Sequence, residues 1–173
     1  SWWSHPSLIP KTSPDSWGYI NLAKDINHEI LEIRPIIFPL FIKFCMSISE
    51  IYWKQIFSII QILFHALICT SIFHLFLRFK FKKIVSFLMT LIIGFNPSLI
   101  YYSTNLLADH LLAVLTTSAW LFTIIFIQND HENKERKKYL FLIGIFSGLA
   151  VVTKPIAILG IVLLIIGVVS IIG

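Results

Sequence analysis

Three long apolar runs constrain this chain more than any other feature of its sequence. They cover residues 52–77, 84–102 and 106–127. Each run is close to the roughly 20 mainly apolar residues that a helix needs to cross a membrane. A fourth stretch, 139–173, is interrupted at Thr153-Lys154-Pro155, which predicts a short helix over 139–153 and another over 156–173 and onward. We therefore predict an all-α fold, a polytopic bundle of transmembrane helices.

Composition agrees with a membrane protein and gives the expected domain organisation. The chain is 57% hydrophobic and only 13% charged, whereas a soluble domain averages about a quarter charged residues. It begins at Ser1 without an initiator methionine and ends at Gly173 inside an apolar run, so we expect it to be a fragment of a longer protein. Residues 1–50 are predicted to form a loop, and 51–173 one truncated membrane domain.

The basic residues indicate how the bundle is oriented. They gather in two short loops, "RFKFKK" at 78–83 and "QNDHENKERKK" at 128–138, whereas the link "STN" has none. Because basic loops stay on the cytoplasmic side, we expect residues 1–50 and 103–110 to be extracytoplasmic. The net charge of +5 therefore reflects membrane topology, and we expect no nucleic-acid partner. Several aromatic residues would then form an outer belt: Trp2, Trp3, Trp17, Tyr52, Trp53, Tyr101 and Tyr102.

The first loop contains a segment with helical periodicity. Apolar residues recur at helical spacing on one face, at Tyr19, Leu22, Ala23, Ile26 and Ile30. Such a helix is expected to lie on the outer membrane surface with its apolar side towards the lipid. Pro35 and Pro39 are expected to end it and turn the chain towards the first span. Cys45 and Cys69 are interpreted as buried hydrophobic residues and not as a disulfide.

Two polar residues of this loop have a structural and a functional interpretation. Ser13-Pro14-Asp15 is a good helix start, in which the Asp15 carboxylate would only interact favourably with the helix dipole. Alternatively, Asp15 is a general base. Arg34 is either an interfacial arginine that reaches the lipid headgroups or a clamp for a phosphate at the membrane surface.

Polar residues also occur within or beside the apolar runs. Asp109 and His110 stand at the outer end of the third span, where two adjacent polar residues are costly, and we favour a functional role over a helix-start acid. Lys154 is either a lysine that reaches the membrane surface or a ligand for a lipid phosphate. Gln61 and His65 lie one turn apart on one helix face, which favours hydrogen bonds between helices.

Several of these features together resemble one enzyme family. The sequence "DSWGYINLAKDI", followed by "IRPIIFPL", resembles the first periplasmic loop of GT-C glycosyltransferases. Within that group, it is most similar to the dolichyl-phosphate-mannose protein mannosyltransferases and the lipid A aminoarabinose transferases. The stretches "FNPSLIYYSTNLLADHLLAVL" and "GIFSGLAVVTKPIAIL" resemble a helix pair and a later segment of the same family.

The resemblance implies roles for individual residues. Asp15 matches the catalytic acid of the first loop, and Asp109 matches a second acid near the site. Arg34 matches a basic residue that contacts the carrier phosphate, and the other candidates for substrate binding are Tyr19, His110 and Lys154. Two positions depart from the family pattern: Ser16 replaces a second acid, and Ile33 replaces an acid implicated in metal binding. We therefore expect no metal and no other cofactor.

The implied activity is transfer of a sugar from a polyprenyl-phosphate carrier to a protein, lipid or glycan acceptor, with inversion. The site would face outwards from a bacterial or archaeal plasma membrane, in contact with membrane lipids. Two alternatives remain open. One is a non-catalytic membrane subunit or transporter fragment, and the other is a glycan polymerase or ligase that uses the same carriers.

Overall fold

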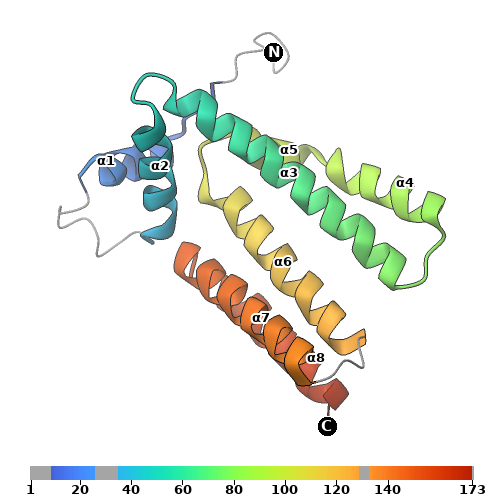
Figure 1. Ribbon diagram of the computed structural model, residues 1–173. Coiled ribbons are helices and arrows are strands. Elements are labelled where there is room, and N and C mark those ends of the chain that lie inside the picture. Colours follow the sequence, from blue (N-terminus) through green and yellow to red (C-terminus); the bar gives the residue numbers. More distant parts are fainter. Residues whose placement is uncertain (1–8, 26–34, 129–132, 173) are drawn as a thin grey trace.

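The computed structural model describes residues 9–25, 35–128 and 133–172, apart from the side chains of 133–136 and 167–172. The described residues form helices and no β-strand, which confirms the predicted all-α fold (Figure 1). In chain order the helices are α1 Pro14–Lys24, α2 Ile37–Ile48, α3 Trp53–Arg78, α4 Lys83–Gly94, α5 Pro97–Thr104, α6 Ala108–Gln128, α7 Asn133–Thr153 and α8 Ala157–Ile172.

Helix α1 begins where the sequence predicted. The Ser13 side chain accepts a hydrogen bond from the Ser16 backbone N–H at 3.3 Å, and the Ser16 hydroxyl accepts one from the Ser13 N–H at 2.8 Å. This reciprocal pair is a capping box, which satisfies two backbone donors that the first turn of a helix leaves without partners. The helix ends at Lys24. The later residues of the predicted apolar pattern, Ile26 and Ile30, lie outside the described residues.

Helix α2 replaces a turn that the sequence predicted. Pro39 was expected to turn the chain towards the first span, but it is the third residue of α2. Proline is tolerated there because the first N–H groups of a helix have no partner within the helix. The first loop therefore contains a second, strongly apolar helix, which the positions of the prolines did not predict.

Among the described residues, two helices are long and apolar enough to span a membrane, and there are three spans if a bent pair of helices is counted as one. The two are α3 and α6, which lie close to the predicted runs 52–77 and 106–127. The run 84–102 is divided into α4 and α5, which meet at a bend of 56°. The break between the two helices falls directly before Pro97. Pro97 opens α5, and the Asn96 side chain caps it by accepting from the Ser98 N–H at 2.9 Å.

Helix α7 is longer than predicted at its N-terminal end. It begins at Asn133 and not at 139, so the basic residues at 133–138 belong to its first turns. Lysine, arginine and glutamate are good helix formers, so the helix extends over this charged segment. The sequence predicted the C-terminal end of α7 correctly, since α7 stops at Thr153 and α8 starts at Ala157, on either side of Pro155.

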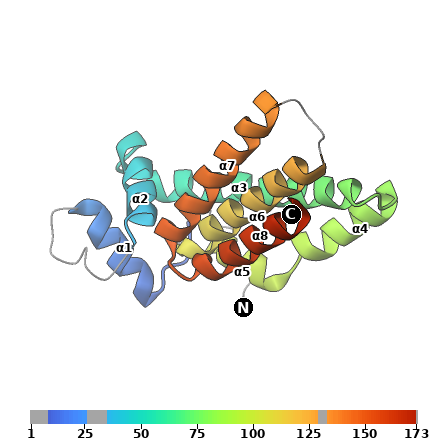
Figure 2. The same cartoon turned by 90° about the horizontal axis from the view of Figure 1, so that it is seen from below.

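Helix α6 lies at the centre of the bundle. It packs against α3 on one side and against α7 and α8 on the other (Figure 1; Figure 2). Helices α4 and α5 run along α3, and α1 and α2 pack together beside the start of α3. The elements near the first loop, the start of α6 and the break between α7 and α8 are thereby brought to one end of the molecule.

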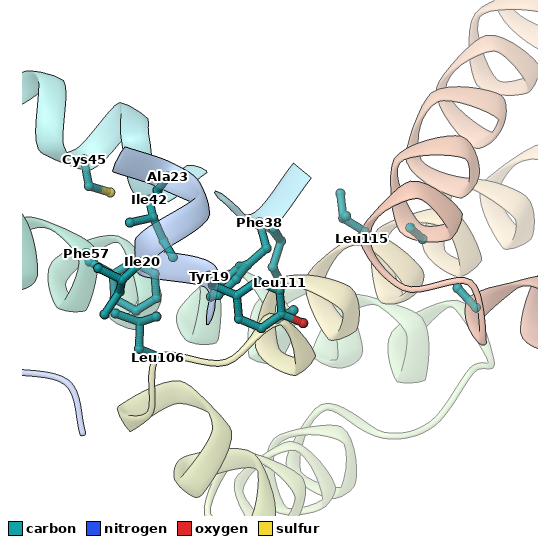
Figure 3. Close-up of a cluster of buried hydrophobic side chains, with 13 residues drawn as sticks. Tyr19, Ile20, Ala23, Phe38, Ile42, Cys45, Phe57, Leu106, Leu111 and Leu115 are labelled. Carbon is teal, nitrogen blue, oxygen red and sulfur yellow. The ribbon is translucent and has the colours of Figure 1, made fainter. Parts of the chain in front are cut away.

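A cluster of buried apolar side chains joins α1 and α2 to the rest of the bundle (Figure 3). Phe38 is its centre. Its ring meets Tyr19 edge-on, with ring centroids 4.9 Å apart, and Phe57 of α3 edge-on at 6.0 Å. Edge-to-face aromatic pairs at these separations are favourable beyond the area that they bury.

The apolar side of α1 faces this cluster and not the lipid, which corrects the expected orientation of the helix. Tyr19, Leu22 and Ala23 are all buried within the protein. Tyr19 and Ala23 belong to the cluster that includes Phe38 and Leu106. Their helical spacing correctly predicted an apolar face, but periodicity cannot tell whether lipid or a neighbouring helix covers such a face.

Truncation of Phe38 should detach α1 and α2 from α3. We expect Phe38→Ala to lower the free energy of unfolding by about 3–5 kcal/mol, because it removes a fully buried aromatic ring. Phe44→Ala is the matched control on the same helix, since Phe44 is 56% exposed. Thermal unfolding in detergent measures both variants. Equal losses of stability in the two would contradict a core centred on Phe38.

Candidate functional site

The segment that precedes α1 is hydrogen-bonded to the link between α5 and α6. The Lys11 N–H donates to the Thr104 carbonyl at 3.1 Å, and the Leu106 N–H donates to the Lys11 carbonyl at 3.0 Å. The buried Ser16 hydroxyl then donates to the Leu106 carbonyl at 2.8 Å. These bonds place the first turn of α1, which carries Asp15, beside the residues that lead into α6.

Asp109 lies in the first turn of α6 and forms an ion pair with Lys154. The Lys154 Nζ donates to the Asp109 Oδ1 at 2.6 Å, and each side chain is 31% exposed. Lys154 stands in the break between α7 and α8, where its backbone N–H closes the last turn of α7 on the Ala150 carbonyl. The sequence left the role of Lys154 open between a lysine that reaches the membrane surface and a ligand for a lipid phosphate. The structure brings it to the acid that the sequence had singled out independently.

Three of the predicted site residues therefore gather at one end of the bundle, although they come from distant parts of the chain. Asp15 is brought there by α1, Asp109 by α6 and Lys154 by the break that follows α7 (Figure 1). A carboxylate that is exposed to solvent and a carboxylate–ammonium pair are the kinds of groups that acid–base and phosphate chemistry require.

Tyr19 occupies a different environment. Its ring lies in the apolar cluster against Phe38, where it attaches α1 to α2 (Figure 3). The sequence proposed it as a substrate-binding residue, and that role stays a prediction. The contacts that the structure gives to its ring are those of a core residue.

His110 faces the interior of the bundle, away from the exposed site. It is fully buried, and its Nδ1 lies 2.5 Å from the Gln61 Oε1 of α3. This contact confirms the predicted hydrogen bonding between helices for Gln61. His110 was grouped with Asp109 because the two are adjacent in sequence, but successive residues of a helix point about 100° apart. Its proposed contact with substrate stays a prediction.

Other predicted features have mixed outcomes. Arg34 and Ile33 lie outside the described residues. Cys45 and Cys69 are both free, as predicted. Among the residues that the structure describes, no group of three His, Cys, Asp or Glu side chains is placed to hold a metal ion.

Comparison with known proteins identifies the family. The family model for dolichyl-phosphate-mannose-protein mannosyltransferases matches residues 33–172. The chain belongs to this family. It is thus an integral membrane protein of the GT-C glycosyltransferase type, as the resemblance implied. Among curated proteins and among solved structures, none matches the chain.

The matched range covers part of the candidate site of this glycosyltransferase. It includes Asp109, His110 and Lys154, whereas Asp15 and Tyr19 lie before it. The sequence pattern did not indicate the residues that attach the first turn of α1, with Asp15, to the matched range. Ser16 was considered only as a substitute for an acid, although its spacing from Ser13 is that of a capping box. No local signal indicated that its hydroxyl reaches Leu106, because that contact spans 90 residues.

A charge swap distinguishes a structural ion pair from a functional one. Asp109→Lys and Lys154→Asp each place like charges together, whereas the double variant restores an attractive pair. For partly exposed partners such a pair contributes about 0.2–1 kcal/mol, so we expect only a small change in stability that the double variant recovers. We expect sugar transfer to stay lost in the double variant, because the carboxylate then projects from a different helix. Thermal unfolding and a transfer assay in liposomes measure the two effects. Recovery of both would make the pair structural only.

Proposed function

We propose that this chain transfers a sugar from a polyprenyl-phosphate carrier to a hydroxyl group of an acceptor on the extracytoplasmic side of the membrane, with inversion. The observation that carries the proposal is the convergence of Asp15 with the Asp109–Lys154 pair at one end of the bundle. The hydroxyl of Ser16, the residue after Asp15, donates to the carbonyl of Leu106, three residues before Asp109, and the Lys154 Nζ lies 2.6 Å from the Asp109 Oδ1. Family membership supports a glycosyltransferase in general, and the choice of donor, acceptor and stereochemistry is part of the proposal.

Asp15 is the proposed general base. It lies in the first turn of α1 on an exposed position, where the helix dipole favours a negative charge. In the reaction the acceptor hydroxyl gives its proton to the Asp15 carboxylate, while its oxygen forms a bond to the anomeric carbon of the sugar. The bond from this carbon to the carrier phosphate breaks, and the phosphate leaves with the electron pair. Attack from the face opposite the phosphate gives inversion, as in inverting hydrolases.

Lys154 and Arg34 are the proposed cations that stabilise the leaving phosphate. Lys154 is half-buried and held by Asp109, so its ammonium group is oriented before substrate arrives. Arg34 suits phosphate oxygens because its planar guanidinium donates two parallel hydrogen bonds. Asp109 has the role of holding Lys154 and balancing its charge when the site is empty.

The orientation of the bundle supports an outward-facing site. The link between α3 and α4 contains Lys80 and Lys82 and is followed by Lys83 at the start of α4, and it lies at the opposite end of α3 from Trp53 (Figure 1). Because basic links remain cytoplasmic, the end that carries Asp109 and Lys154 faces outwards. This is the side on which lipid-linked sugars would meet an extracytoplasmic acceptor.

Replacement of the proposed base tests the function directly. Asp15→Asn should lower the rate of transfer by about a hundred- to ten-thousand-fold, since an amide cannot take up the proton. The fold should persist, because the capping box of Ser13 and Ser16 stays intact and loss of the charge–dipole interaction costs only about 0.3–1 kcal/mol. Asp25→Asn is the control, as it changes an acid at the other end of the same helix. The assay is transfer from a polyprenyl-phosphate sugar in liposomes, with melting temperature measured in parallel.

Two outcomes would contradict the proposal. Normal turnover by Asp15→Asn would show that the acid only starts the helix. A wild-type protein without transfer activity towards any polyprenyl-phosphate sugar would favour a non-catalytic membrane subunit or a transporter. Joining of carrier-linked glycans to one another would instead favour a polymerase or ligase.

The orientation is tested by labelling of single cysteines. In a background with Cys45→Ala and Cys69→Ala, Thr12→Cys should react with a membrane-impermeant thiol reagent in intact cells. Lys82→Cys should react only after permeabilisation, because basic links remain on the cytoplasmic side. Both positions are exposed, so burial does not limit the reaction. Labelling of Lys82→Cys in intact cells would reverse the orientation and place the site inside.

A further inference from the structure

A cluster of polar side chains joins three helices, and its members are buried except for the half-buried His65. Gln61 and His110 are fully buried, and the Gln61 Oε1 lies 2.5 Å from the His110 Nδ1 across the interface between α3 and α6. His65 is one turn along α3 from Gln61, and its ring stacks on that of His110 with centroids 5.9 Å apart and planes 14° apart. The His65 Nε2 lies 3.1 Å from the Gly94 carbonyl at the end of α4.

The protonation of the cluster follows from its partners. A carbonyl oxygen only accepts, so the His65 Nε2 carries a proton that it donates to Gly94, and the His110 Nδ1 donates to the Gln61 side chain. This arrangement fixes the orientation of both imidazole rings. Each ring is then held by a hydrogen bond to a different helix and by the stacked face of the other ring.

Stability alone does not account for this cluster. Within the described part of the chain, three of its buried atoms have no hydrogen-bond partner: Gln61 Nε2, His65 Nδ1 and His110 Nε2. Buried polar atoms without partners destabilise a fold, whereas apolar groups of similar shape would pack at this interface without that cost. What a directional hydrogen bond provides in addition is a fixed register and rotation of one helix against another.

The rotation of α6 matters because Asp109 directly precedes His110. Successive residues of a helix point about 100° apart, so a His110 side chain held against α3 turns Asp109 towards another direction. The Asp109 side chain meets Lys154, which lies in the break between α7 and α8. These two helices pack against α6 on the side away from α3 (Figure 1). A rotation of the first turn of α6 would break both contacts together.

We propose that Gln61 is a positioning residue, which acts through His110 to set the rotation of α6 at which Asp109 meets Lys154. His65 assists by stacking on the His110 ring. The importance of this positioning for catalysis rests on the proposed function of Asp109 and Lys154. The positioning itself is a property of the bundle that is measurable without activity.

The kinetic test compares Gln61→Met, His110→Phe and the double variant. Gln61→Met keeps the length of an unbranched side chain, and His110→Phe keeps a flat ring. Misplacement of a reacting group by about 1 Å costs on the order of a hundredfold in rate, so we expect kcat to fall about 10- to 100-fold in each. KM for the polyprenyl-phosphate sugar should stay unchanged. The double variant should be no slower than the slower single variant, because both changes remove one interaction.

Stability and a control variant separate positioning from damage to the fold. The double variant should melt at or above the wild-type temperature, since it removes both partners of the hydrogen bond and their unpartnered atoms together. Thr123→Val is the control on α6, because the buried Thr123 hydroxyl donates to the Ala119 carbonyl of its own helix, at 2.8 Å. It should leave kcat unchanged. A fall of kcat that follows the loss of folded protein would overturn the proposal. So would a raised KM in His110→Phe alone, which would make His110 a substrate contact.

The activity-independent test measures where residue 109 lies. Asp109→Cys and Lys154→Cys are combined in a background with Cys45→Ala and Cys69→Ala, and the two thiols are joined with a short bifunctional reagent in liposomes. Gln61→Met should lower the yield several-fold, whereas Thr123→Val should leave it unchanged. An unchanged yield in Gln61→Met overturns the positioning role. A lowered yield together with full activity of Asp109→Asn would preserve the positioning role and refute the proposed function of Asp109.

Discussion

The candidate site depends on how the first turns of α6 are held. Ser16 bonds to the Leu106 carbonyl just before the helix, Asp109 pairs with Lys154, and His110 bonds to Gln61. These contacts point in different directions, so they fix α6 against α1, the break after α7, and α3. Each one joins segments that are at least 45 residues apart in the chain. No segment of the protein contains the site by itself.

The membrane explains why polar contacts have this role. Between helices in lipid there is no difference in polarity to drive association, so packing and hydrogen bonds decide which faces meet. Many large apolar side chains of α3, α4 and α8 are exposed, as expected for surfaces that face lipid. Helices α6 and α7, which pack together, carry small buried residues instead, namely Ser118, Ala119, Ser147 and Ala150. Small residues let helix backbones approach closely, and the few directional polar contacts then select one arrangement.

The first loop has a more specific role than that of a membrane anchor. Its two helices bury their apolar faces in a cluster around Phe38, and its capping box holds Ser16 where its hydroxyl reaches Leu106. The same helix start that gives Asp15 an ordinary structural explanation thus also orients it. The structural and the functional interpretation of Asp15 are compatible, because a helix that is anchored at its first turn holds a side chain there in a defined position.

The sequence by itself determined the all-α class, the long apolar spans, the helix start at Ser13 and the break at Pro155. These are local properties, set by hydrophobic length, capping chemistry and the missing N–H of proline. It also indicated the family and singled out Asp109 and Lys154 separately. Only the tertiary structure decided that these two residues pair, that His110 turns inwards to Gln61, and that protein covers the apolar face of α1. A residue pattern records which face of a helix is apolar or polar, but the neighbour that the face meets is set by how distant segments pack together.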